Sequence, residues 1–499
     1  MPLAAAGAPL LGVRGTTNGT TPTGAARIGS LLPGPMRCVL SLFLALATPA
    51  QASLLDDIPA GTGYTAFDMC TRAFVTGQPR ARVRRGYIAP EVQPLPWVWS
   101  IAIGRDTVSV VSRLPGFAGR RVALFRPGLG CTIVPPGTSI AAVRAQPFTR
   151  NPSPPPSAAS WPAGEGAAEL SADHARLTAI ADRVFGETPT SPGETTDTVA
   201  FLVARDGHLV YERYGPGTTR DQPQLGWSLT KSLTALVAGL FVGDGRIALD
   251  DAVGLPAWEG TAAARITWRS LLTMTAGLDW TEDYGERSDV TEQLFSQADQ
   301  GGWSAARRPL SRPGTTFNYA TGMPTVAMLR MRQLLAGDSQ ALYDLYQHRL
   351  FVPLGIRDGV IAPDATGTPA GGSNGVLRPT DWLRLGQLVV DRGQWAGQQL
   401  IPASYIDFML QPTPADAGYG GYVWFPAALS IPADVRADLP ADTFIFWGHL
   451  GQFVIGSPSA RLVLLRIGVT HYDDEAPLRV LLPAFAELAA PARPPSDQK

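Results

Sequence analysis

The sequence contains almost no lysine. Of its 41 basic residues only two are lysine, Lys231 and the C-terminal Lys499, and the rest are arginine. A guanidinium group stays protonated at physiological pH, so arginine cannot serve as a base, whereas an amine can. Lys231 is therefore the first candidate for a catalytic base.

The chain is also poor in charge and in histidine. Charged residues make up 17% of its 499 positions, the formal net charge is −1, and the arginines are not gathered into one basic stripe. We therefore expect no nucleic-acid partner, because such binding needs a continuous basic surface. The five histidines form no i, i+4 pair and no Cys-His cluster, so we expect neither a metal nor another cofactor.

The N-terminal segment is typical of a cleaved export signal. From Met36, which we take as the true start, an arginine precedes an apolar run over 39–47. Ala50 and Ala52 supply the small residues for cleavage before Ser53. The apolar run is too short to remain in a bilayer as an anchor. We therefore predict a secreted or periplasmic protein with no stable membrane anchor.

Cleavage leaves two cysteines, Cys70 and Cys131. In an oxidising compartment such a pair favours a disulfide. Spacing alone does not establish proximity, so two buried free thiols are the alternative.

Composition divides the chain into five segments. Residues 92–135 alternate apolar and polar side chains, which predicts strands, and 146–166 are rich in proline, which neither pairs in a sheet nor continues a helix. The predicted segments are a signal region over 1–52, a β-rich N-terminal region over 53–145, a linker over 146–166, a catalytic domain over 167–490 and a tail over 491–499.

The catalytic domain is predicted to contain a sheet around a central helix. Asp206-Gly207 between two apolar runs indicates a hairpin, and residues 229–241 have apolar side chains at helical spacing on nearly every face. Near the C-terminus we expect one strand over 444–456 with His449 in its middle, a turn, a second strand and a helix over 477–489.

Ser228 precedes Lys231 by three positions at the start of the central helix. Residues at i and i+3 share a helix face, so the hydroxyl and the amine are expected to meet. Burial and the positive end of the helix dipole favour the neutral amine, which can take the Ser228 proton and allow an acyl-enzyme to form. The alternative is a lysine that extends to solvent from a core helix.

Two later segments complete a pattern. Tyr319-Ala320-Thr321 stands before an apolar helical run, and His449-Leu450-Gly451 follows a glycine. The chain thus contains Ser-x-x-Lys, then a tyrosine motif, and then a third motif that begins at His449. Three motifs in this order resemble the serine β-lactamase and penicillin-binding superfamily over about 165–490. The phrases over 271–278 and 353–356 strengthen a likeness to class C members. Within it, the chain looks most similar to the 6-aminohexanoate-dimer hydrolase and carboxylesterase branch.

The resemblance implies an α+β fold, with an antiparallel sheet flanked by helices and a helical subdomain. It also implies a small-molecule substrate and a set of roles. The implied roles are nucleophile for Ser228, base for Lys231, shared proton transfer for Tyr319, oxyanion donors in the N–H groups of Ser228 and Gln452, and substrate contacts for His449, Gly451 and Tyr284 of a loop over 282–289.

Two departures from the β-lactamase pattern bear on the substrate. His449 replaces the lysine of Lys-Thr-Gly, and a histidine is largely neutral at pH 7 unless its surroundings perturb it. Thr321 replaces an asparagine amide. We therefore expect hydrolysis of a small amide or carboxylic ester. The alternatives are β-lactamase or D-Ala-D-Ala peptidase activity, and a domain that recognises penicillin or peptides without hydrolysis.

A rival nucleophile is Ser373 in Gly371-Gly372-Ser373-Asn374-Gly375, which matches the nucleophile elbow of α/β-hydrolases. That elbow needs a buried strand before it and a helix directly after it. The preceding residues are polar and Pro379 follows, so this interpretation is disfavoured.

Overall fold

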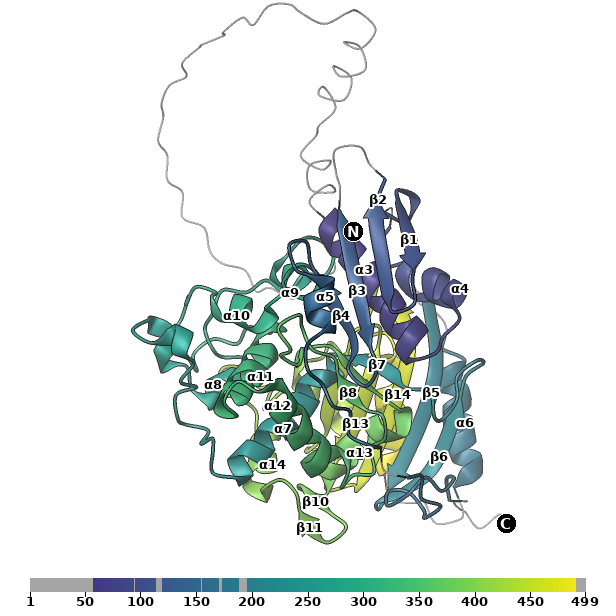
Figure 1. Cartoon of the computed structure of the whole chain (residues 1–499). Coiled ribbons are helices and arrows are strands. Elements are labelled where there is room, and N and C mark those ends of the chain that lie inside the picture. The colour runs from purple at the N-terminus through teal and green to yellow at the C-terminus, as the bar shows by residue number, and fades with distance from the viewer. Residues whose placement is uncertain are drawn as a thin grey trace, which may run out of the picture. The chain divides into compact units, whose positions relative to one another are not determined.

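The computed structural model describes residues 57–93, 95–113, 119–153, 155–169, 173–187 and 195–490. From Ile58 onward the chain forms one compact unit (Figure 1). The predicted signal region and tail lie outside the described residues. Among the helices that are described, none combines the length and the apolar character needed to cross a bilayer.

A five-stranded antiparallel sheet forms the centre, in the order β12-β13-β14-β5-β6. Its strands are β5 (Thr195–Arg205), β6 (His208–Tyr214), β12 (Phe444–Gly448), β13 (Gln452–Ser457) and β14 (Leu462–His471). The β5–β6 turn at Asp206-Gly207 is the predicted hairpin, and both turn residues have positive φ. The antiparallel sheet flanked by helices confirms the predicted fold class.

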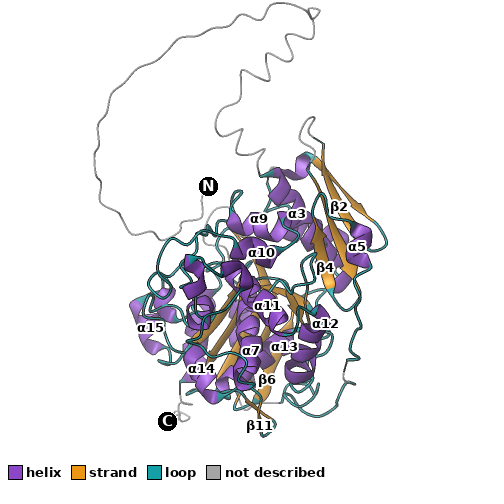
Figure 2. Ribbon diagram, turned by 60° about the vertical axis from the view of Figure 1, so that its left-hand side comes forward, coloured by secondary structure: helices purple, strands orange, loops and turns teal. Residues whose placement is uncertain are grey.

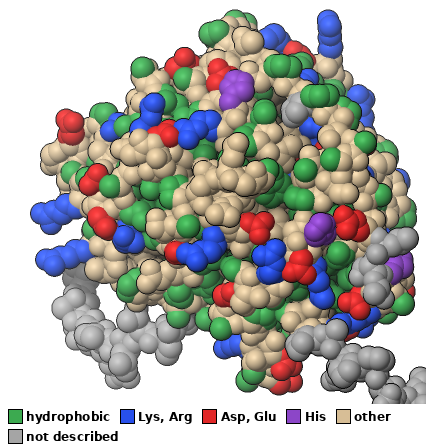
Figure 3. Space-filling model, turned by 90° about the horizontal axis from the view of Figure 1, so that it is seen from below, with side chains coloured by type: hydrophobic (Ala, Val, Ile, Leu, Met, Phe, Trp, Pro, Cys, Tyr) green, Lys and Arg blue, Asp and Glu red, His purple; other side chains and the backbone are tan. Residues whose placement is uncertain are grey.

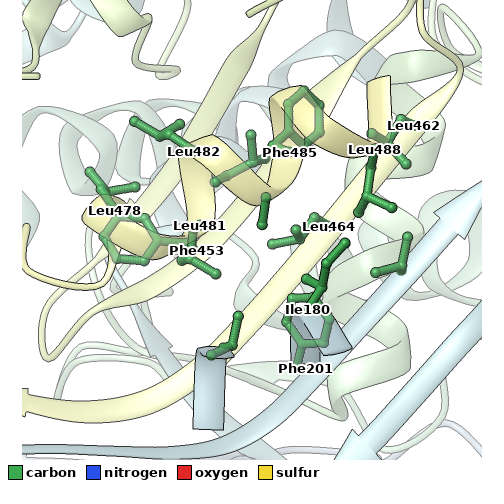
Figure 4. Close-up of a cluster of buried hydrophobic side chains, with 14 of the residues drawn as sticks. Ile180, Phe201, Phe453, Leu462, Leu464, Leu478, Leu481, Leu482, Phe485 and Leu488 are labelled. Atoms are coloured by element: carbon green, nitrogen blue, oxygen red, sulfur yellow. The ribbon is translucent and has the colours of Figure 1, made fainter. Parts of the chain in front are cut away.

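Helices cover both faces of this sheet. Helices α6 (His174–Phe185) and α16 (Leu478–Ala489) pack on one face. Figure 4 shows Leu481 and Phe485 of α16 against Leu464 of β14 in this apolar core. Helices α7 (Leu229–Gly243) and α13 (Pro379–Val390) pack against the sheet as well. Helix α7 is buried over 229–241, as its all-round apolar pattern predicts.

A helical part surrounds the other sides of α7 (Figure 2). It contains α8 (Trp268–Leu272), α9 (Asp289–Ser296), α10 (Gln300–Ala305), α11 (Gly322–Leu334), α12 (Ser339–Tyr346) and α14 (Ala403–Met409). A small sheet in the order β7-β9-β8 leads into α7. Its strands are β7 (Gln224–Trp227), β8 (Val360–Ile361) and β9 (Gly375–Leu377). On the face in Figure 3, acidic and basic side chains are interspersed.

The N-terminal region combines a helix with a four-stranded antiparallel sheet in the order β1-β2-β3-β4. Its strands are β1 (Trp99–Ile103), β2 (Thr107–Ser112), β3 (Arg120–Arg126) and β4 (Gly130–Val134). Helix α3 (Ile58–Cys70), which the sequence analysis did not predict, packs on this sheet and on α9. A disulfide joins Cys70 at the end of α3 to Cys131 on β4.

The predicted single strand over 444–456 is wrong. Strand β12 ends at Gly448 and β13 begins at Gln452, and the two strands pair antiparallel across a turn over 449–451. Leu450 and Gly451 have φ values of 63° and 74°, the left-handed region that a tight turn requires. His449 therefore lies at a hairpin tip, not within a strand.

Candidate active site

Ser228 and Lys231 meet at the start of α7. Strand β7 ends at Trp227, and the helix begins one residue after Ser228. The Lys231 Nζ atom lies 2.7 Å from the Ser228 Oγ atom. Lys231 is 1% exposed, while Ser228 is half-buried. The structure thus brings together the predicted nucleophile and the predicted base.

Two further oxygen atoms surround the Lys231 amine. Its Nζ atom lies 2.8 Å from Thr321 Oγ1 and 2.9 Å from the Gly372 carbonyl oxygen. A neutral amine has two hydrogens and one lone pair, so these oxygens can take the hydrogens and leave the lone pair facing Ser228. Burial lowers the pKa of Lys231 to about 8, against the opposing effect of Glu282. The amine is therefore partly uncharged at neutral pH.

Glu282 organises the neighbours of the lysine. It accepts hydrogen bonds from Trp280 Nε1 at 2.6 Å, from the Thr321 backbone N at 2.8 Å and from the Tyr284 hydroxyl at 2.8 Å. The Thr321 hydroxyl also donates to Glu282, so its oxygen lone pairs remain free to accept from Lys231. The sequence analysis placed Glu282 in the substrate loop without assigning it this role.

Tyr319 lies over the lysine, in the loop before α11. The centre of its ring is 4.7 Å from Lys231 Nζ, and its hydroxyl interacts with Ser228. Burial and the charge of Glu282 raise the pKa of the Tyr319 phenol, and the contact with Ser228 offsets only part of this effect. The phenol stays protonated at neutral pH, so it is suited to donating a proton.

The turn over 449–451 lies at the sheet edge next to the nucleophile. Strand β12 is the edge strand, and α7 packs against it. A Cβ atom on Gly448 would lie 2.2 Å from the Gly226 carbonyl oxygen, so β12 ends directly against the residues before Ser228. The first N–H beyond β12 belongs to His449. This position favours the N–H groups of His449 and Ser228 as a pair of oxyanion donors.

Gln452, the predicted oxyanion donor, is not at this edge. It begins β13, which lies between β12 and β14, and it pairs with Gly448. Ile445 on β12 exchanges both of its backbone hydrogen bonds with Trp424, away from β13, so the backbone groups of Gly448, three residues later, point toward β13. The Gln452 N–H therefore points toward β12 and its pairing partner. The prediction of Gln452 as an oxyanion donor, which the family resemblance implied, is therefore wrong.

His449 is a cation, contrary to the expectation of a largely neutral ring. Its Nδ1 atom lies 3.1 Å from Asp474 Oδ2, and its Nε2 atom lies 3.2 Å from Glu91 Oε2. Burial alone would lower the pKa of His449, but the two carboxylates raise it to about 10. The third motif thus carries a positive charge on His449, and both N–H groups of its ring are bound by carboxylates of the protein.

Glu91 brings the N-terminal region to the site. It also contacts His471 Nδ1. Burial would raise the pKa of Glu91, but its hydrogen bonds with His449 and His471 lower it to about 2. Tyr64 of α3 stacks on Trp227, the residue before the nucleophile, with ring centres 5.7 Å apart. The sequence analysis did not predict that residues before the linker reach the site.

Tyr284 lies in the site, where it was predicted to contact substrate. Its ring stacks on His449, with centres 5.6 Å apart and planes 6° apart. Its hydroxyl is bonded to Glu282 and lies 3.3 Å from Thr321 Oγ1. Tyr284 therefore bridges the lysine network and the turn.

The rival serine is not placed as a nucleophile. Ser373 is 2% exposed, and its hydroxyl donates to the Asn374 side chain. The segment contributes backbone instead, because the Gly372 carbonyl accepts from Lys231. In the described part of the chain, no group of three or more His, Cys, Asp or Glu side chains is arranged to hold a metal ion.

Comparisons with known proteins find similar hydrolases. The chain is 25% identical over 234 residues to 6-aminohexanoate-dimer hydrolase of Paenarthrobacter ureafaciens, a match that covers 44% of this chain and 58% of that relative. A solved Bacillus anthracis structure, described as a 6-aminohexanoate-dimer hydrolase, is 19% identical with a TM-score of 0.50 over 58% of this chain and 79% of that one. A class C beta-lactamase is 13% identical with a TM-score of 0.49, covering 65% and 100%.

The likeness to the Bacillus anthracis structure concerns the fold alone. The family match extends further, because residues 182–440, or 259 of 499, match the family Beta-lactamase. That span includes Ser228, Lys231 and Tyr319 in the predicted order. The chain therefore belongs to the beta-lactamase family.

Proposed function

We propose that this protein is an exported serine hydrolase that cleaves a small amide or carboxylic ester through an acyl-enzyme on Ser228. The observation that carries the proposal is the 2.7 Å contact between Ser228 Oγ and the buried amine of Lys231. The three oxygens around this amine are neutral groups, so no direct ion pair in the described chain fixes its charge. The likeness to a 6-aminohexanoate-dimer hydrolase supports a linear amide as one substrate class.

The reaction begins when neutral Lys231 takes the proton of Ser228 as Oγ bonds to the substrate carbonyl carbon. The N–H groups of Ser228 and His449 bind the resulting oxyanion. Tyr319 gives its proton to the leaving nitrogen or oxygen as that bond breaks, and it recovers a proton from Lys231. Water then attacks the acyl-enzyme as Lys231 takes a proton from it, and Lys231 returns this proton to Ser228 Oγ as the acyl–oxygen bond breaks.

The charge at the turn supports a neutral substrate. His449 is positive, but Glu91 and Asp474 bind both its ring N–H groups and together carry two negative charges. A β-lactam carboxylate approaching this turn meets no free donor on the ring and an excess of negative charge. We therefore favour neutral amides and esters over β-lactams.

Turnover of p-nitrophenyl esters, short linear amides and one cephalosporin tests the proposal. The wild type is expected to hydrolyse an ester or amide with multiple turnovers. The substitutions Ser228→Ala and Lys231→Ala are expected to abolish this hydrolysis. Intact-mass analysis of a slow ester should show an acyl adduct that is absent in Ser228→Ala. A stable adduct without turnover would instead identify a recognition domain.

Export is supported by the signal-like N-terminus and by the Cys70–Cys131 disulfide, since such bonds persist in oxidising compartments. N-terminal sequencing of the protein from a periplasmic fraction is expected to begin at Ser53. An uncleaved chain confined to the cytoplasm would contradict export.

A further inference from the structure

A groove of about 850 Å³ lies on the N-terminal region. Its lining contains none of the residues that form the active site. Trp99, Ile101 and Ile103 of β1 contribute apolar side chains to it. Residues at i, i+2 and i+4 of a strand share a face, so these three lie on one side of the sheet.

The apolar lining is exposed because of how the N-terminal sheet is covered. Strand β1 is the edge strand, and α3 packs across its neighbours β2 and β3. Trp99 is buried, whereas Ile101 and Ile103 are only half-buried. The inner face of β1 is therefore left partly open to solvent beside the segment over 80–88.

Four arginines line the groove: Arg80, Arg84, Arg85 and Arg113. All four are exposed. Among the described residues, none of the four has a carboxylate within ion-pair distance. Arg82 in the same segment is different, because it pairs with Asp197 at 3.3 Å and donates to the Pro216 carbonyl at 2.8 Å. The segment over 80–85 thus contains one arginine with a structural role and three for which the described residues provide no ion pair.

Trp97 stands at the same groove and is 81% exposed. A large aromatic side chain in water, next to unpaired arginines, is typical of proteins that contact a bilayer. Indole rings sit at the headgroup level, and arginines bind lipid phosphates. An anionic surface complements the four charges and covers the apolar floor at the same time.

We propose that this groove docks the protein on an anionic phospholipid surface. Arg80, Arg84, Arg85 and Arg113 bind headgroup phosphates, and Trp97 enters the interface. The proposal is independent of the hydrolase reaction, since the groove shares no residue with the Ser228 site.

Vesicle co-sedimentation of the full mature chain tests this docking. Vesicles of phosphatidylglycerol with phosphatidylcholine are compared with vesicles of phosphatidylcholine alone, at low and at physiological salt. The groove variant is Arg80→Gln/Arg84→Gln/Arg85→Gln. The control variant Arg105→Gln/Arg265→Gln/Arg312→Gln removes the same charge from exposed positions outside the groove.

The wild type is expected to bind the anionic vesicles, with affinity that falls as salt rises. Each arginine near such a surface contributes roughly fivefold, so the groove variant should bind about 100-fold more weakly. The control variant should lose far less, and Trp97→Ala should also weaken binding. Both triple variants should keep the wild-type unfolding temperature and ester turnover, which shows that they fold.

Three results would overturn the proposal. The first is equal binding of the wild type to neutral and anionic vesicles, or no binding to either. The second is an equal loss in the groove and control variants, which would show a general charge effect. The third is full displacement from vesicles by inorganic phosphate or by a soluble acidic peptide at matched charge, which would identify a soluble anion as the ligand.

Discussion

At the residue scale, Lys231 must lose its proton to act. Replacing it by arginine keeps the positive charge but removes the group that can become neutral. We expect Lys231→Arg to lose ester turnover almost as completely as Lys231→Ala, by about 10²- to 10⁴-fold in kcat. Initial-rate kinetics on purified, folded variants would measure this, and substantial turnover by Lys231→Arg would refute the assignment of the base.

The same amine sets the pH dependence. With the pKa of Lys231 lowered to about 8, the fraction of neutral amine rises with pH and passes one half near that value. We expect kcat/KM to rise with pH and to level off above 8. The charge of Glu282 raises the pKa of Lys231, so Glu282→Gln should shift the rise of kcat/KM to lower pH. A profile that stays flat between pH 6 and 9 would contradict the neutral-amine mechanism.

Ser228, Lys231 and Tyr319 could be predicted from the sequence, because the first two are joined by helix spacing and the third by order along the chain. Glu282 and Glu91 could not be assigned roles in this way. Glu282 acts through the Thr321 hydroxyl, and Glu91 comes from a distant segment. Neither connection has a local pattern that a sequence displays.

At the element scale, the β12–β13 hairpin illustrates how a pattern misleads. Apolar residues on both sides of His449 indicate one strand, and no Asn-Gly or Asp-Gly pair marks the turn. The turn forms because Leu450 and Gly451 adopt left-handed φ values and because Asp474 binds the Leu450 N–H at 3.0 Å. The prediction about Gln452 came from the family resemblance, and the turn is what separates Gln452 from the edge of the sheet.

Arg466 stabilises the turn of the β12–β13 hairpin through a hydrogen bond. It is fully buried on β14 and donates to the Gly451 carbonyl. We expect Arg466→Met to loosen the turn that carries the His449 N–H, and to lower kcat by about 10²-fold with a smaller change in KM, as for the loss of an oxyanion donor. Arg384→Met removes an equally buried arginine that pairs with Asp381 on α13, and it is the control.

Both arginine variants should lose stability, but only Arg466→Met should lose kcat beyond what its folded fraction explains. Steady-state kinetics at a temperature where both variants are folded would compare them. An equal loss of kcat in the two would remove Arg466 from any positioning role.

At the scale of the whole molecule, Glu91 links the N-terminal region to the hydrolase core through His449. Asp474 and Glu91 together raise the pKa of His449 from 6.5 to about 10, so the two pairings stabilise the fold fully below pH 6.5, and this stabilisation is lost as pH rises through 10. We expect Glu91→Gln to lower the free energy of unfolding by about 3 kcal/mol at pH 6. It should also flatten the decline of stability between pH 6.5 and 10.

Denaturant unfolding at a series of pH values would measure this effect. Glu169→Gln is the control, because Glu169 pairs with His208 at 3.2 Å on the surface, where such pairs contribute little. Equal effects of the two substitutions would contradict the linkage.

The Cys70–Cys131 disulfide also contributes to the stability of the whole molecule. Cys70 and Cys131 are 61 residues apart, and a loop of that length predicts a loss of about 4 kcal/mol when the bond is removed, through the larger entropy of the unfolded chain. Cys70→Ser/Cys131→Ser is expected to unfold at lower temperature by calorimetry, and reductant should shift the wild type but not the double variant. An unchanged midpoint would show that the bond contributes nothing.

The sequence analysis predicted the strands of the N-terminal region and, in the core, the β5–β6 hairpin, α7, β14 and α16, because each has its own periodicity or turn signal. It did not predict that the two form one compact unit from Ile58 onward. Helix α3 carries small residues and shows no clear apolar face, since it is buried on nearly every side. Contacts between distant elements, such as that of Tyr64 with Trp227, are decided by packing and leave no periodic signal.

Glu91 contacts two histidines that follow the matched family segment, and it precedes that segment itself. If the N-terminal region were exchanged for an unrelated one, His449 and His471 would therefore lose the Glu91 carboxylate, even with every residue over 182–440 unchanged. Such a chimera would retain the nucleophile Ser228 but would lose one of the two counter-ions of His449. The two regions therefore have to be exchanged together if His449 is to keep the Glu91 carboxylate.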